Sequence, residues 1–256
     1  MVTRFRRLVL PATFGMALLV ACPQLAAAAA EVHRLSLVLS SIPTSVVGGD
    51  FNDEINDYNK THLRPKGLQA LDEITIAWYQ AAEFRYFVRP NVAVNFGLGQ
   101  LRSQTKREFL PRIGQTINLR AEVLSVPVSV GAAYYLAPYN QGDFQARAYL
   151  GAGFLSMTYT HAMLEQTEIG VDSTTTLGGT FRTRGTRDGP GYYVEAGAHM
   201  FFAVRYSVLL SAVYRSAQVR GLVDENTHQP YTNADGEPFT LDLSGVGARF
   251  ALAIGF

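Results

Sequence analysis

The residues that could do chemistry are ionisable side chains at alternate positions of apolar segments. Glu83 and Arg85 are two residues apart, and Glu195 and His199 are four apart in another segment. Residues separated by an even number share one face of an extended strand. Such a face can carry ion pairs or line a polar passage. The full set of inward candidates is Arg34, Glu83, Arg85, Arg147, Glu195, His199, Arg215 and Arg249.

Burying these charges costs free energy, and two interpretations of the charged face account for that cost. An isolated charge in a low-dielectric interior is unfavourable, so the groups must be paired or hydrogen-bonded. One interpretation is a structural network of Arg–Glu pairs that fills a narrow barrel and fixes the strand register. The other is an arginine-lined passage for a small anionic or amphipathic solute, with Gly97 and Gly99 reducing inward bulk. The sequence favours the network and leaves the passage open.

The last segment of the chain shows the clearest alternation. From Val246 to Phe256 every even position is apolar, whereas the odd positions are small or charged and include Arg249. A period of two predicts a strand with one face against an apolar medium.

The same reading predicts eight strands and an all-β fold. The connections alternate between short turns and long polar segments at 43–71, 105–116, 162–188 and 221–238. This plan predicts a closed eight-stranded antiparallel transmembrane β-barrel in which the last strand pairs with the first. Pro127 predicts a bulge or local break, because proline cannot donate to the ladder. The expected strands are 32–42, 72–88, 91–104, 117–137, 143–161, 189–203, 205–220 and 239–256.

Aromatic residues lie near the expected strand ends, as in the girdles of membrane barrels. One girdle is expected at the short turns and the other at the long loops. The first would contain Tyr86, Tyr134, Phe202, Tyr206 and Phe256, and the second Tyr192 and Tyr214.

Phe250, Leu252, Ile254 and Phe256 form one apolar face of a strand that ends on phenylalanine. This face resembles the C-terminal assembly signal of bacterial outer-membrane barrels. The whole pattern resembles the small eight-stranded group that includes the OmpX, OmpW and opacity-type families. The resemblance implies a monomer in the bacterial outer membrane, in contact with its lipid and lipopolysaccharide and recognised by the barrel assembly machinery. It implies passage of small or hydrophobic solutes, or surface binding and envelope integrity through external loops.

Residues 1–30 are predicted to be a signal peptide, which leaves a barrel domain at 31–256. Arg4, Arg6 and Arg7 precede an apolar stretch, and Ala26 to Ala30 offers cleavage sites. Cys22 either leaves with this peptide or becomes an acylated first residue. Removing three arginines leaves 19 basic and 21 acidic side chains, a net charge of −2. No basic stripe survives, so we expect no nucleic-acid partner.

An enzymatic reading is the alternative, since some small outer-membrane barrels modify lipids with a His and a Ser on the outer rim. Here His161 lies near Ser156 and Thr158. Strict alternation puts His161 and Tyr159 on one face and the two hydroxyl residues on the other. That arrangement does not support a Ser–His contact. We therefore expect no catalytic residues and no cofactor.

The acidic run from Asp50 to Asp57 could suggest a metal, yet Ile55 stands where a calcium loop needs glycine. It instead predicts a short helix capped by Asp50, with Phe51, Ile55 and Tyr58 on one face. We expect no metal site. In the loop at 162–188, the arginines could attract lipopolysaccharide phosphates or simply be solvated. They are Arg182, Arg184 and Arg187.

Overall fold

The structure is a computed structural model that describes residues 33–112, 115–141, 144–169, 174–185, 191–202, 205–225, 227–233 and 235–256. The predicted signal peptide, Cys22 and Arg187 lie outside these residues. The side chains of Arg182 and Arg184 also lie outside the description, although their backbone belongs to a strand. The expectations for all of them stay predictions.

Eight antiparallel strands close a barrel. The closing pair runs from Ser36 opposite Gly255 to Thr44 opposite Gly247, so the predicted pairing of the last strand with the first is confirmed. The strands are β1 (Leu35–Ser45), β3 (Ile76–Arg89), β4 (Val92–Arg112), β5 (Gln115–Tyr135), β7 (Phe144–Ile169), β9 (Gly191–Phe201), β10 (Tyr206–Ser216) and β14 (Gly245–Gly255).

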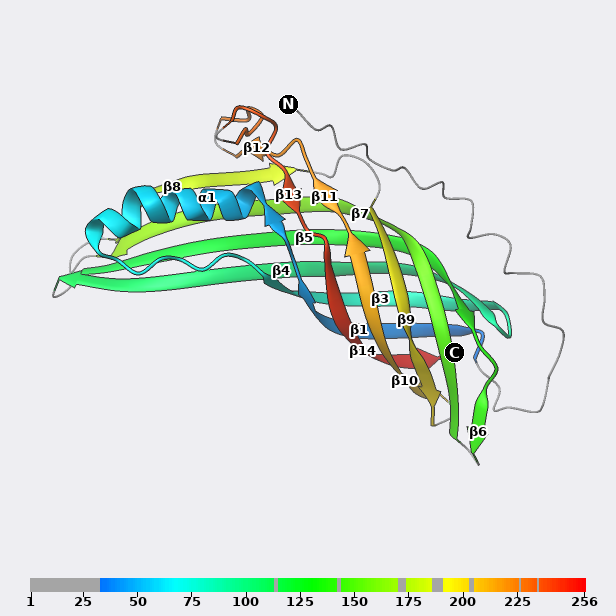
Figure 1. The fold of residues 1–256 in the computed structure, drawn as a ribbon. Helices are drawn as coiled ribbons and strands as arrows, with labels where there is room; N and C mark the ends of the chain where they lie inside the picture. Colours follow the sequence, from blue (N-terminus) through cyan, green and yellow to red (C-terminus); the bar gives the residue numbers. More distant parts are fainter. Residues whose placement is uncertain are drawn as a thin grey trace, which may run out of the picture.

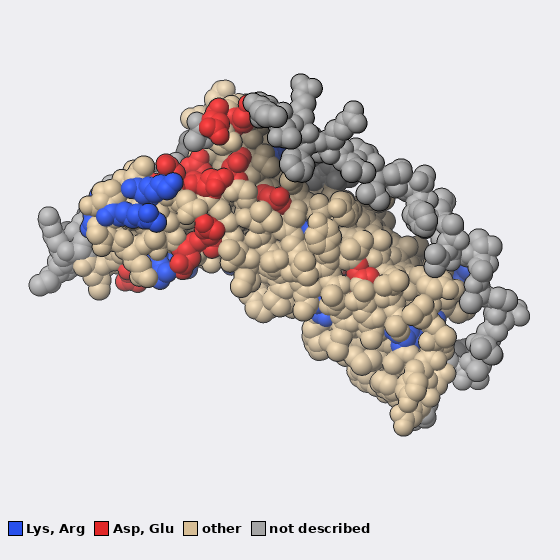
Figure 2. All heavy atoms as spheres, viewed as in Figure 1, with Lys and Arg blue, Asp and Glu red and all other residues tan. Residues whose placement is uncertain are grey.

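The wall of this barrel is apolar outside and polar inside. On β14, Phe250 is 59% exposed, whereas the neighbouring Arg249 is 6% exposed. Figure 2 shows the same inversion, because the barrel surface carries few charged atoms and most red and blue atoms gather beyond it. This polarity fits hydrocarbon outside and a filled lumen inside, so the fold is a transmembrane β-barrel. Among the helices of the described residues, none is both long and apolar enough to cross a bilayer.

Three barrel strands continue far past the wall and form a feature that we call the arm (Figure 1). The arm consists of residues 103–112, 115–123 and 160–169 of β4, β5 and β7, together with β8 (Thr174–Gly185), which pairs with upper β7. Its edge also pairs with β12 (Val223–Asp224). The prediction of loops at 105–116 and across 162–188 was therefore wrong. These polar segments lack apolar alternation because much of the arm faces water.

One bulge interrupts the strands where the barrel meets the arm. The β5–β7 register shifts at Val126/Pro127, which confirms the irregularity predicted there. Val126 lies opposite Tyr159 and Pro127 opposite Met157, so Thr158 is an extra residue on β7. An extra residue reverses which positions face inward. Met157 is buried below the bulge and Thr160 above it.

A helical segment covers the arm and the mouth of the barrel. We call β2 (Gly48–Gly49), α1 (Asp50–Tyr58), the π-helix η2 (Asn59–Leu63) and the 3-10 helix η3 (Arg64–Lys66) the cap. Phe51, Ile55 and Tyr58 are buried on one face of α1, as predicted. Asp50 is the first helical residue and Gly49 is the N-cap, so the predicted Asp50 cap was wrong. The Asp50 carboxylate instead accepts a hydrogen bond from Thr240 N at 2.7 Å.

Short elements hold the cap in place. Asn52 bonds to the backbone of Val47 and Ile74, and Asn59 bonds to that of Leu71, at distances of 2.8–3.0 Å. β2 pairs with β13 (Leu241–Asp242), which pairs with β11 (Gln218–Val219). At the opposite, short-turn end of the barrel, β6 (Tyr139–Gln141) pairs with β7.

Candidate functional site: the charged lumen

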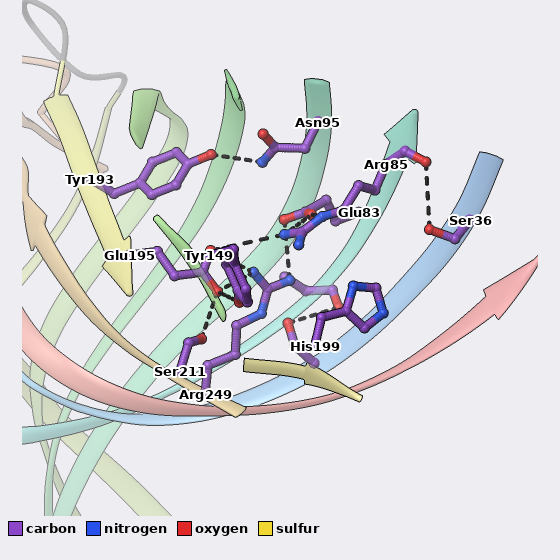
Figure 3. A network of polar contacts seen from close by, with 12 residues as sticks. Ser36, Glu83, Arg85, Asn95, Tyr149, Tyr193, Glu195, His199, Ser211 and Arg249 are labelled. Atoms are coloured by element: carbon purple, nitrogen blue, oxygen red, sulfur yellow. Dashed lines mark hydrogen bonds and ion pairs between the residues drawn. The ribbon is translucent and has the colours of Figure 1, made fainter. Parts of the chain in front are cut away.

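Two carboxylates and two guanidinium groups form the centre of the lumen (Figure 3). Arg249 lies between the glutamates, 3.1 Å from Glu83 and 3.2 Å from Glu195. Arg85 lies 2.7 Å from Glu83 and 3.9 Å from Glu195. All four side chains are buried. Each charge therefore has an opposite charge beside it, as a low-dielectric interior requires.

Hydroxyl groups complete the coordination of these charges. Ser211 donates to Glu195 at 2.6 Å, and Tyr149 also donates to Glu195. Arg85 donates to the Tyr135 hydroxyl at 2.7 Å. Together with Arg249, these residues come from six strands, which are β3, β5, β7, β9, β10 and β14. The network therefore links the barrel wall across its interior.

His199 and Arg147 extend this network toward the short turns. The His199 ring lies 3.2 Å from the Tyr135 hydroxyl and 2.7 Å from the Ser207 hydroxyl. Arg147 donates to the backbone oxygens of Pro90 at 2.6 Å and Leu136 at 3.5 Å. Its guanidinium also lies over the Tyr135 ring at 5.2 Å. These contacts fill the lower lumen with hydrogen-bonded side chains.

Arg34 and Arg215 do not join the ion pairs. Arg34 precedes β1 and is exposed, so the prediction that it faces the lumen was wrong. The alternation of β1 begins only at Leu35, which leaves Arg34 at the rim. Arg215 is buried at the opposite end of the lumen, where it donates to Leu243 O at 2.9 Å and lies 5.9 Å from the Tyr79 ring.

Above the network, apolar side chains close the mouth. Phe51 and Ile55 of the cap belong to a buried cluster with Leu101, Leu155 and Tyr193 of the barrel strands. The lumen thus has three levels from the short turns to the mouth: hydrogen-bonded arginines and tyrosines, the ion pairs, and the apolar cluster. The structure thus brings together six of the eight predicted lumen residues: Glu83, Arg85, Arg147, Glu195, His199 and Arg249.

The lumen also contains tyrosines, which the set of candidate residues from the sequence did not include. Tyr135 and Tyr149 are each 1% exposed and their rings stack with centroids 5.2 Å apart. Tyr193 accepts a hydrogen bond from Asn95 at 2.7 Å. The alternation of the strands could have identified two of them, because Tyr149 shares a face with Arg147, and Tyr193 shares a face with Glu195 and His199.

The outer face of the arm carries a second group of charges near the edge of the apolar belt. Glu122 accepts from Arg102 at 2.8 Å and pairs with Arg120. Arg102 lies directly opposite Trp78 on the adjacent strand, and Trp78 is 55% exposed. Because tryptophan marks the headgroup level of membrane proteins, Arg102 lies at that level. Arg120 lies opposite Lys106, four residues farther along the strands.

His161 lies on the outer face of the wall, as Ser156 does. The prediction that strict alternation puts these two residues on opposite faces was therefore wrong. The extra residue Thr158 reverses the alternation, so Ser156 below it and His161 above it both point away from the lumen. The imidazole Nε2 lies 3.5 Å from Glu225 Oε1. Among the described residues, no serine or threonine hydroxyl is recorded as a hydrogen-bond partner of this ring. The arrangement offers a His–carboxylate pair without an oriented nucleophile.

Metal-binding potential is equally limited in the described part of the chain. No group of three or more His, Cys, Asp or Glu side chains there is placed to hold a metal ion. The acidic side chains of α1 instead influence one another. Burial and the nearby Asp57, Asp50 and Asp53 carboxylates raise the pKa of Glu54 above its ordinary value.

Comparisons with solved structures find outer-membrane proteins at low similarity. The chain is similar to the N-terminal barrel domain of Pseudomonas aeruginosa OprF (12% identity, TM-score 0.37, 86% of this chain and 97% of that one). Ail of Yersinia pestis is 12% identical, with a TM-score of 0.32, and the match covers 87% of this chain and 98% of that one. The outer membrane protease OmpT of Escherichia coli is 12% identical, with a TM-score of 0.30, and the match covers 87% of this chain and 95% of that one. No family model and no curated sequence matches the chain. Similarity at this level assigns neither a subfamily nor an activity.

Proposed function

We propose that this protein is a non-enzymatic barrel of the bacterial outer membrane that is closed to solutes and acts through its external surface. In this proposal the arm and the cap lie outside the cell and the short turns face the periplasm. Its role is surface binding and envelope integrity at the lipopolysaccharide layer. Passage of solutes is the alternative that the closed lumen argues against.

The filled lumen is the observation that carries this proposal. Arg85 and His199 are each 1% exposed, and their neighbours occupy the lower and middle lumen. Phe51, Ile55 and Leu155 then close the mouth. A solute would have to separate buried ion pairs and displace an apolar cluster, and separating one buried pair alone costs roughly 3–5 kcal/mol.

The arm supports a role at the surface. Its strands continue the barrel ladder, so it is held rigidly with respect to the wall. Arg102 lies opposite Trp78 at the base of the arm, and Arg120 lies farther along the arm on the same outer face, where both pair with Glu122. Guanidinium groups pair well with phosphate oxygens through parallel hydrogen bonds. The lipopolysaccharide phosphates at this level are therefore the partner that we propose.

Reconstitution tests this partner directly. The protein is inserted into vesicles with and without lipopolysaccharide, and its thermal unfolding temperature is measured. We expect lipopolysaccharide to raise that temperature, and the Arg102→Ala/Arg120→Ala variant to lose most of the increase. The Arg64→Ala/Lys66→Ala variant, which changes exposed cap residues away from Trp78, should keep it. An equal increase in both variants would contradict the proposal.

A lipid-modifying activity is the second candidate, and the outward position of His161 beside Glu225 is the observation that favours it. A histidine oriented by a carboxylate is a common general base. The candidate lacks an oriented hydroxyl among the described residues. A deacylase or acyltransferase assay on lipid A tests it, because activity that disappears in His161→Ala would replace the non-enzymatic proposal.

A further inference from the structure

A small cavity lies in the lumen between the ion pairs and the apolar cluster. Its volume is about 50 Å³, and its polar lining includes Tyr79, Glu83, Tyr193, Glu195, Arg215 and Arg249. One water needs roughly 10–15 Å³ on the same measure, so the cavity can hold a monatomic ion together with water.

Two arginine nitrogens in this lining have no hydrogen-bond partner among the residues that the structure describes. They are Nη2 of Arg215 and Nε of Arg249, and both atoms are buried. The two side chains are only 5% and 6% exposed. A buried N–H group without an acceptor is costly, more so when it belongs to a charged group. The two nitrogens therefore call for an acceptor inside the cavity.

The charge balance of the lumen makes that acceptor an anion. Four buried arginines (Arg85, Arg147, Arg215 and Arg249) face two buried glutamates (Glu83 and Glu195) there. The glutamates are occupied by Arg85, Arg249, Tyr149 and Ser211. Arg215 has only the Leu243 carbonyl and the Tyr79 ring as partners among the described residues. Its charge thus lacks a carboxylate.

We propose that this cavity binds one halide-sized monovalent anion, held by Arg215 and Arg249. The Tyr193 hydroxyl can add a donor, because it already accepts from Asn95 and keeps its own proton free. Ile42, Leu155 and Val213 form an apolar part of the wall. An apolar wall favours weakly hydrated anions, which lose less hydration on burial, so bromide and chloride should bind better than fluoride.

Thermal unfolding in detergent micelles at constant ionic strength tests this site. Replacing gluconate by chloride or bromide should raise the unfolding temperature in a saturable manner, because a ligand that binds only the folded state stabilises it. Fluoride should give a smaller shift. The halide effect should disappear in Arg215→Met and persist in Arg147→Met, since Arg147 is buried but lies outside the cavity lining. Equal unfolding temperatures in bromide and gluconate, or a full halide effect in Arg215→Met, would overturn the proposal.

A crystal of the unmutated protein grown with bromide provides a readout that does not depend on a variant folding. Anomalous scattering should show bromide between Arg215 and Arg249. A well-ordered cavity that contains no anomalous peak would equally overturn the anion site.

Discussion

At the scale of single residues, Glu195 is the acceptor that joins most of the lumen. Its carboxylate accepts from Arg249, Tyr149 and Ser211, and Arg85 lies 3.9 Å away. Glu122 offers a natural comparison on the outer face, because it also accepts from two arginines. The arginine partners of Glu122 are partly exposed, whereas those of Glu195 are buried.

Glu195→Gln should therefore destabilise the barrel far more than Glu122→Gln. Removing the buried carboxylate leaves guanidinium charge uncompensated, which costs roughly 3–5 kcal/mol. Glu122 is also buried, but water can solvate the guanidinium groups of Arg102 and Arg120 after its charge is lost, so the loss costs less. Urea unfolding in micelles, followed by tryptophan fluorescence, measures both free energies. Similar losses in the two variants would show that burial does not set the strength of the lumen network.

Glu54 gives the cap a predictable pH dependence. The pKa of its carboxyl is raised above about 4.5, first by burial and then by Asp57, Asp50 and Asp53. The folded cap therefore holds this proton more tightly than the unfolded cap, and its stability falls as the pH rises from 4.5 through the raised pKa. Hydrogen exchange of the α1 amides should become faster over that range. Glu54→Gln should flatten this dependence after correction for intrinsic exchange rates, and an unchanged dependence would refute this assignment.

At the scale of elements, the start of α1 depends on Gly49. Its φ is +60°, and a Cβ atom there would lie 2.7 Å from the Thr240 carbonyl oxygen. Gly67 also has a positive φ, of +68°, but a Cβ atom there meets nothing within 4 Å. The two glycines also differ in backbone conformation: ψ is −140° at Gly49, a combination open almost only to glycine, and 18° at Gly67, in the left-handed region.

Gly49→Ala should loosen the cap and Gly67→Ala should change it much less. The left-handed conformation of Gly67 costs an alanine roughly 1–2 kcal/mol. Gly49→Ala would instead occupy a backbone region that is almost closed to alanine, and its Cβ would also collide with the backbone of Thr240 next to β13. Limited trypsin digestion at Lys60 and Lys66 reports the loosening. Faster cleavage in Gly49→Ala than in Gly67→Ala is the expected result, and equal rates would argue against the tight contact.

The elements also show what can be predicted from sequence. The strands that face an apolar medium could be predicted because every second residue in them is apolar, as on β14. Pro127 predicted an irregularity because proline has no backbone N–H to donate to the ladder. The arm was missed because Thr105 to Glu108 is polar on both faces. Pro127 did not reveal that the extra residue of this bulge is Thr158 on the partner strand, so the predicted face of His161 was wrong. Asp50 was taken as the helix cap because the positive φ of Gly49 before it was not recognised.

The lumen was predictable only as a set of charges. Parity identified Glu83, Arg85, Glu195 and Arg249 as inward residues, and the structure joins them. Parity cannot give the partners, since these depend on the relative register of six strands. The unpaired nitrogens of Arg215 and Arg249 follow only from that register.

At the scale of the whole molecule, the barrel differs in surface chemistry from the arm and the cap. The barrel presents apolar side chains to its surroundings, and the arm and cap carry most of the visible surface charge (Figure 2). The interior between them is filled from the short turns to the mouth, apart from the cavity beside Arg215. A closed barrel of this kind can contribute to the envelope through the surfaces that it presents to lipid and to the outside.

Planar-bilayer recording of the purified, inserted protein tests the closed lumen most directly. Because Arg85, Glu195 and Arg249 stay paired beneath the apolar cluster, we predict no discrete channel openings across the voltage range. Insertion is checked independently by the heat-dependent electrophoretic mobility of the folded barrel. Reproducible unitary conductance steps from the unmutated protein would contradict the account and favour a passage for solutes.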